Sequence, residues 1–89
     1  MKIRIIYKKL GKEKAHGIAC SDGEILIDSR LKGKKHLEIV IHEVMHLLNP
    51  EDSEDEIVRK SVALTKILWK EGYRRVDNHD KDLLQDGSK

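Results

Sequence analysis

The segment from Leu37 to Leu48 contains no glycine or proline, and it carries an H-E-x-x-H motif that begins at His42 and ends at His46. An apolar-rich segment of this length without breakers is predicted to form a single helix. Residues four apart lie one above the other on a helix, so His42 and His46 can reach the same Zn²⁺ ion. Glu43 then projects beside the metal rather than onto it. This arrangement suits a zinc-bound water with a carboxylate base next to it.

Local signals predict where the motif helix begins and ends. Lys34 or Lys35 starts it, directly after the glycine of a short loop. It stops before Asn49-Pro50, because the residue that precedes a proline avoids the helical region.

A second helix is predicted to follow this loop. Ser53 and Glu56 form a capping-box pattern, with the serine at the N-cap and the glutamate three positions later. The helix is expected to run to about residue 71, where Gly72 stops it. Its predicted inward stripe comprises Ile57, Ser61, Leu64, Thr65 and Leu68.

Three strands are predicted before the helices. Residues 2–7 alternate between charged and β-branched side chains, and residues 16–20 and 24–28 form two further apolar runs. Asp22-Gly23 separates these two runs and is a strong hairpin signal. The expected fold class is therefore α+β: a small three-stranded antiparallel sheet packed on two α-helices.

The 89 residues are enough for one small domain. With no Phe, one Trp and two Tyr, the core must be built mainly from Ile, Leu and Val. Trp69 is predicted to lie in that core. We expect a single domain over residues 1–76 and a polar, flexible tail over residues 77–89, where charged residues and Asn replace the apolar pattern.

The cysteine content and the hydropathy predict a cytoplasmic protein. Cys20 is the only cysteine, so no intramolecular disulfide can form. The first residues lack the apolar region of a secretory signal, and no apolar run reaches membrane-spanning length. No membrane partner is expected.

Charge is distributed unevenly along the chain. Residues 1–36 hold ten Lys/Arg against four Asp/Glu, whereas residues 37–89 hold eight against twelve. A basic segment can indicate a nucleic-acid partner, but no aromatic or glycine pattern accompanies this one. A nucleic-acid partner is therefore not expected, and the lysines are interpreted as solvated strand and loop residues.

A catalytic zinc site normally has three protein ligands, so two histidines need a third group. The acidic start of the second helix is the nearest source. Glu54 lies three residues before Ile57 on the inward stripe, and the positive end of the helix dipole would stabilise its charge. We therefore expect the metal ligands to be His42, His46 and Glu54. The other candidates for the third ligand are Asp55, Glu56, His16 and His79.

The order of these features resembles a known class of protein. A short β-region, the H-E-x-x-H helix, a proline-containing loop, an acidic helix start and the segment Leu68-Trp69…Gly72-Tyr73-Arg74 are similar to small metallopeptidases of bacteriophages and prophages. They are more distantly similar to SprT-like and ImmA/IrrE-like proteins. The resemblance covers roughly residues 15–75 and implies a minimal zincin-like core.

This resemblance implies a zinc-dependent metallopeptidase that acts on a peptide or protein substrate, in the host cytoplasm if the chain is phage-encoded. His42 and His46 would be zinc ligands, and Glu43 would be the catalytic acid and base. The alternative is a non-catalytic, zinc-stabilised binding or regulatory module, in which a protein partner completes the site of so short a chain.

Two further expectations concern residues around the site. A peptide can bind as an added strand on a sheet edge, and either residues 17–20 or residues 24–28 can offer one. His36 lies six residues before His42, so it is predicted to point away from the motif and to be exposed. The residues that can supply a second electrophile are Tyr73, His16 and Arg74.

Overall fold

A computed structural model describes residues 2–11 and 16–76 of the chain. The strands are β1 (Arg4–Lys8), β2 (Gly17–Ala19) and β3 (Glu24–Asp28), and the helices are α1 (Gly33–Leu48) and α2 (Glu54–Lys70). The predicted tail, residues 77–89, lies outside the described residues.

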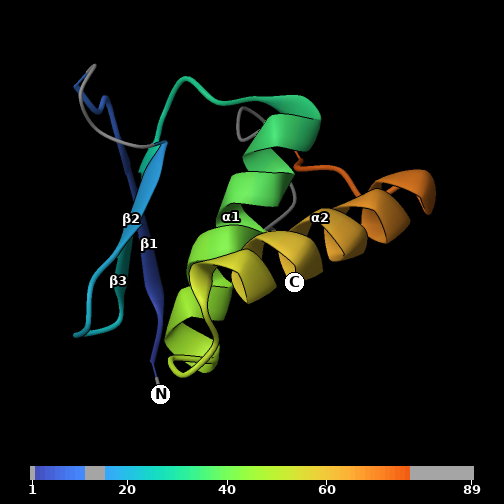
Figure 1. Cartoon of the computed structure of the whole chain (residues 1–89). Helices are drawn as coiled ribbons and strands as arrows, with labels where there is room; N and C mark the ends of the chain where they lie inside the picture. Colours follow the sequence, from blue (N-terminus) through green and yellow to red (C-terminus); the bar gives the residue numbers. More distant parts are fainter. Residues whose placement is uncertain (1, 12–15, 77–89) are drawn as a thin grey trace.

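The elements form three successive layers, which Figure 1 shows as the sheet, then α1, then α2. Helix α1 contacts β2 and β3 on one side and α2 on the other, whereas α2 contacts none of the described strands. The predicted α+β class is confirmed. The expectation that both helices pack on the sheet is wrong, because α1 lies between the sheet and α2.

The sheet is mixed rather than antiparallel. Its strand order is β1-β3-β2, with β1 parallel to β3 and β2 antiparallel to β3. The Asp22-Gly23 hairpin is confirmed, and Gly23 adopts a φ of 97° there. A side chain at Gly23 would also collide with the carbonyl oxygen of Lys2, 2.5 Å from the position of a Cβ atom.

The position of β3 explains why the antiparallel expectation fails. Ile25 and Ile27 are fully buried, whereas four of the five residues of β1 are exposed. A central strand has neighbours on both edges, so the strand with the most apolar surface gains most from that position. Strand β3 therefore lies between β1 and β2, and β1 pairs with β3 instead of with β2. Charged residues suit the exposed β1 edge, and Arg4 forms an ion pair with Glu24 across the parallel ladder.

An arginine-carboxylate pair ties the end of β3 to the segment after β1. The backbone N–H, Nε and Nη2 of Arg30 donate to Asp28 at 2.9, 2.9 and 2.7 Å, and Nη2 also donates to the carbonyl of Leu10 at 2.9 Å. The hydrogen bonds from Arg30 hold the pKa of the Asp28 carboxyl well below its usual range. This pair positions the turn that leads into α1.

The helix limits agree closely with the predictions. Helix α1 begins at Gly33, one residue before the earlier predicted start, and ends at Leu48, before Asn49-Pro50. Helix α2 begins after Ser53, whose Oγ accepts a hydrogen bond from the N–H of Glu56 at 3.2 Å. The predicted N-cap at Ser53 is therefore confirmed, but the return bond of a capping box is not seen among the described residues, because the Glu56 side chain pairs with Arg59.

The inner face of α2 is narrower than predicted. Ile57, Ser61 and Thr65 are its buried residues, but Leu64 is 37% exposed. The buried line therefore follows positions 57, 61 and 65, four residues apart, and Leu64 lies beside this line rather than on it. The Ser61 hydroxyl donates to the carbonyl of Val58 at 3.2 Å, so its burial leaves no unpaired donor.

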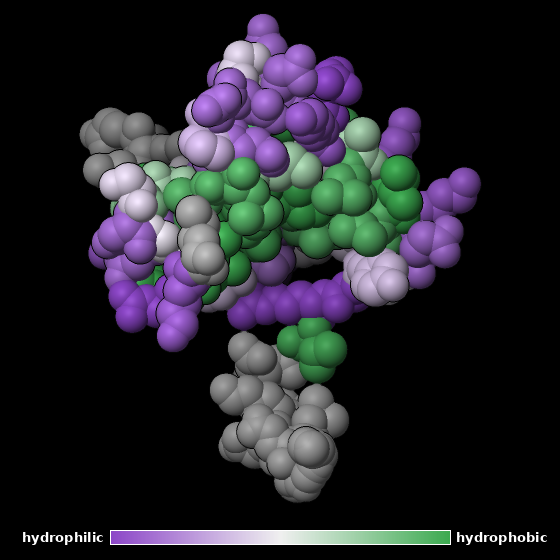
Figure 2. Space-filling view, turned by 90° about the horizontal axis from the view of Figure 1, so that it is seen from below, coloured by the Kyte–Doolittle hydropathy of each residue, from purple (hydrophilic) through white to green (hydrophobic). Residues whose placement is uncertain are grey.

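Several apolar side chains remain on the surface. Figure 2 shows apolar surface gathered on the face seen from below, framed by hydrophilic side chains. The large apolar residues of α2 that are exposed are Val58, Val62, Leu64 and Ile67.

Within the described ranges, none of the helices combines the length and the apolar character needed to cross a bilayer.

The packing of α2 on α1 can be tested at Ile57. Ile57 is fully buried and Val58, the next residue, is 42% exposed. We expect Ile57→Ala to lower the free energy of unfolding by about 2 to 5 kcal/mol, because it leaves a cavity between the helices. Val58→Ala is the matched control and should change it by about 0.5 kcal/mol. Urea unfolding monitored by circular dichroism measures both, and equal effects would contradict the assignment of the interface.

Candidate metal centre

One face of α1 brings the two motif histidines together. His42 and His46 are one helical turn apart, and their Nε2 atoms lie 3.2 Å from each other. The rings meet edge to face, with centroids 4.8 Å apart. Both side chains are partly accessible, so the pair lies at the surface of the helix layer and not in the core.

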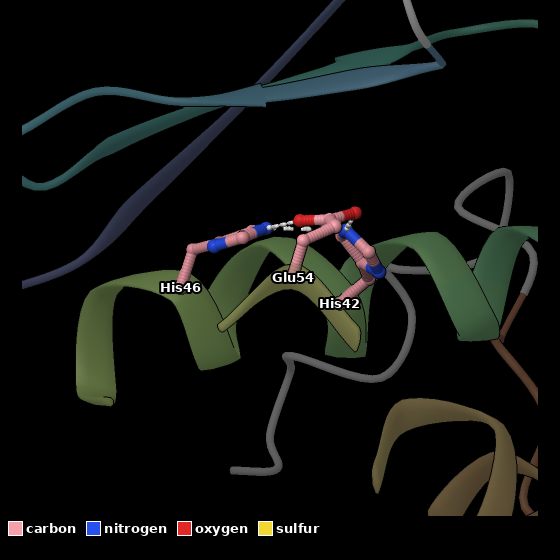
Figure 3. Close-up of side chains that lie close together, drawn as sticks. All are labelled: His42, His46 and Glu54. Atoms are coloured by element: carbon pink, nitrogen blue, oxygen red, sulfur yellow. Dashed lines mark hydrogen bonds and ion pairs between the residues drawn. The ribbon is translucent and has the colours of Figure 1, made fainter. Parts of the chain in front are cut away.

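The first residue of α2 adds a carboxylate to this pair. Glu54 Oε1 lies 3.0 Å from His46 Nε2, and Oε2 lies 3.4 Å from His42 Nε2. Figure 3 shows the carboxylate lying between the two ring nitrogens, reached from the neighbouring helix. The Ser53 cap fixes the start of α2, and thereby the point from which the Glu54 side chain projects.

The three donor groups fit a divalent metal ion. Zn–N and Zn–O bonds of about 2.0 to 2.2 Å in a tetrahedron give ligand-to-ligand distances of about 3.3 to 3.6 Å. The separations of 3.0, 3.2 and 3.4 Å between these three groups are close to those edges. Two imidazole nitrogens that face one another need a proton or a cation between them, since two lone pairs repel. A proton shared with Glu54 or a metal ion meets this need.

Glu43 lies on a different face of α1, toward the sheet. It is one of the two buried residues of that helix, only 7% exposed. Burial raises the pKa of the Glu43 carboxyl, against the lowering effect of His42 and His46. A metal ion at the histidines would act in the same direction as the imidazoles and favour the carboxylate.

The sheet approaches Glu43 through a glycine. A Cβ atom at Gly17 would lie 3.0 Å from Cγ of Glu43, 3.3 Å from its Oε2, and 3.0 Å from Cγ2 of Ile39. Only glycine lets β2 pack this closely on α1. In the sequence the only sign of this contact is a glycine at the start of an apolar strand.

Glu43 and His46 open into a cleft of about 590 Å³ between β2 and the end of α1. Strand β2 is at the edge of the sheet, and the described residues pair only its other side, with β3. Of the two edges considered from the sequence, β3 is central and cannot accept a further strand. The residues that line the cleft are Ala19, Ser21, Glu43, His46, Leu47 and Pro50.

The other candidate ligands and electrophiles lie elsewhere. Asp55 and Glu56 are exposed, and Glu56 accepts a hydrogen bond from Nη2 of Arg59 at 2.7 Å. Tyr73 and Arg74 line a different hollow, at the end of α2. His16 is exposed and does not belong to the three-residue group, and His79 lies outside the described residues.

His36 points away from the motif, as predicted, but the expectation that it is exposed is wrong. It is 8% exposed, and its Nε2 lies 2.9 Å from the hydroxyl of Tyr7. Burial, with the charge of Arg75, lowers the pKa of this imidazole. The reason is tertiary: β1 lies on the far side of β3 from β2, which brings Tyr7 over the first turn of α1.

The chain matches no protein-family model, no curated protein and no solved structure. The resemblance to phage-type metallopeptidases therefore rests on the motif and the order of the elements alone.

The contact between β2 and Glu43 can be tested by Gly17→Ala. We expect a loss of about 1 to 3 kcal/mol in the free energy of unfolding, because the added methyl group overpacks the space held by Glu43 and Ile39. Combining it with Ile39→Ala should cost less than the sum of the two single changes, since the second relieves the first. Urea unfolding of the four proteins checks this, and strict additivity would show that the contact does not exist.

Proposed function

We propose that this chain is a zinc-dependent peptidase with a minimal zincin-like core. The observation that carries the proposal is the convergence of His42, His46 and Glu54, whose facing donor atoms are 3.0 to 3.4 Å apart. Glu43, the proposed base, and His46, one of the three proposed ligands, line the same open cleft.

His42, His46 and Glu54 would hold the ion. When bound, Zn²⁺ supplies Lewis-acid chemistry toward water and a carbonyl oxygen. Glu43 acts as the base: its carboxylate takes a proton from the water that adds to the scissile carbonyl carbon. As the C–N bond breaks, Glu43 returns this proton to the leaving amine. The contact with β2 through Gly17 holds the Glu43 side chain beside the cleft.

The edge of the sheet supports a peptide as substrate. Strand β2 ends at Ala19, which lines the cleft together with Glu43 and His46. An extended peptide added to the free edge of β2 would pass this cleft, and its main chain would pair with the strand. Cys20, which forms no disulfide, is compatible with the proposed action in the cytoplasm.

A non-catalytic zinc module is the second candidate, favoured by the exposure of the donor group. The Glu54 side chain is 63% exposed, so the described chain leaves this proposed ligand largely uncovered. In that case the metal would stabilise the contact between the two helices, and a partner protein would cover the site.

Metal binding is tested by zinc titration against a chromophoric chelator, with elemental analysis of the purified chain. We expect one Zn²⁺ per chain, and affinity at least about tenfold lower for Glu54→Gln, because the amide loses the charge of the ligand. Glu56→Gln is the matched control, in the same helical turn but paired with Arg59. Failure of the wild type to take up zinc would disprove the metal centre.

Hydrolysis is tested on a mixture of unfolded peptides by mass spectrometry. We expect Glu43→Gln to keep its zinc but to lose about 10²- to 10⁴-fold in cleavage rate, because it removes only the base. Glu38→Gln, on the same helix, serves as the control. If zinc-loaded wild type cleaves no peptide, the peptidase proposal is disproved and the non-catalytic zinc module is the remaining candidate.

A further inference from the structure

A second hollow lies beside the N-terminal half of α1, and it shares no lining residue with the cleft at Glu43. Its volume is about 360 Å³, within the range of small-molecule sites. Strand β1, helix α1 and the end of α2 all contribute to it. Its lining residues are Tyr7, Gly33, His36, Leu37, Val40, Trp69, Tyr73, Arg74 and Arg75.

This hollow contains every aromatic residue of the chain. The sequence has one Trp, two Tyr and no Phe, and all three of these side chains line it. Leu37 and Val40 of α1 complete an apolar wall. Aromatic side chains give a flat apolar ligand a large contact area with little loss of conformational freedom. Their concentration in one place indicates recognition of a planar apolar group.

Cations border the same hollow. The guanidinium of Arg74 lies 3.4 Å from the centroid of the Trp69 ring, and that of Arg75 lies 4.5 Å from the centroid of Tyr7. An adjoining hollow shares Gly33, His36 and Arg75 and adds Lys32. No Asp or Glu of the described chain lines either hollow. The described lining of the two hollows therefore carries positive charge that no acidic side chain within it neutralises.

The Arg74 side chain is held in place but keeps hydrogens for a ligand. Its Nη1 donates to the carbonyls of Trp69 and Tyr73 at 2.9 and 3.1 Å. Among the described residues these bonds use Nη1 only, so there the hydrogens on Nε and Nη2 have no acceptor and can bind a carboxylate. The hydroxyl of Tyr7 and Nε2 of the buried His36, 2.9 Å apart, add polar atoms to the wall of the hollow.

We propose that this hollow binds a small aromatic carboxylate: a planar apolar ring with one anionic group. The ring lies among Trp69, Tyr73 and the apolar wall of α1, and the carboxylate accepts hydrogen bonds from Arg74 and Arg75. Two arginines in the lining, with no acidic side chain among the described lining residues to offset them, disfavour a cationic ligand, and the aromatic wall disfavours a purely polar anion such as phosphate. The site is independent of the proposed metal centre.

The test uses the full chain, labelled with ¹⁵N, and the probe 2-naphthoate, with 2-naphthamide as its neutral isostere. Trp69 is the only tryptophan, so its indole N–H gives one resonance that reports directly on the hollow. We expect 2-naphthoate to shift this resonance saturably and to bind at least about tenfold more tightly than 2-naphthamide.

Arginine variants test whether Arg74 and Arg75 cause the preference for the anionic probe. The double variant Arg74→Gln/Arg75→Gln should lose the preference for the anion, whereas Arg59→Gln, an exposed arginine of α2 bonded to Glu56, should keep it. No shift at millimolar 2-naphthoate, or equal affinity for the two probes, would overturn the proposal. The comparison of the two probes on the wild type stands even if the double variant does not fold.

Discussion

The packing of α2 on α1 is the interaction on which the candidate metal centre depends. Helix α2 contacts α1 but none of the described strands, and Ile57, Ser61 and Thr65 are its buried residues. Glu54 is one turn before Ile57, and it faces the two histidines only while this line stays packed. A metal bound by these three residues would therefore stabilise the helix pair.

Helix α1 contributes residues both to the candidate metal centre and to the second hollow, from different faces and different ends. Its buried residues, His36 and Glu43, are seven positions apart and both face the sheet, where one meets Tyr7 and the other meets Gly17. The histidines of the motif face α2. The buried apolar residues of the described chain, Leu10, Ile25, Ile27 and Ile57, lie outside α1, whereas the buried residues of α1 itself are polar. Burying ionisable groups in this way costs stability unless partners compensate it, and His36 has such a partner in the hydroxyl of Tyr7.

Local signals in the sequence predicted most of what is local in the structure. The limits of both helices, the Ser53 cap and the Asp22-Gly23 turn follow from the geometry of a few neighbouring residues, and each is present. The close approach of His42 and His46 follows from helical spacing alone. Glu54 was chosen by periodicity, and the structure brings it to the histidines, although its role as a ligand stays a proposal.

Tertiary packing decided what local signals cannot encode. The order of strands depends on which strand has the most apolar surface to bury, which is a comparison among all three, so β3 became central and the sheet mixed. That order brought Tyr7 to His36 and helped gather the three aromatic side chains in one hollow. The sequence by itself thus determined the helices, their ends and the spacing of the motif, because these rest on contacts within one or two turns. The tertiary structure alone decided strand order, the burial of His36 and the second hollow, because these join residues far apart in the chain.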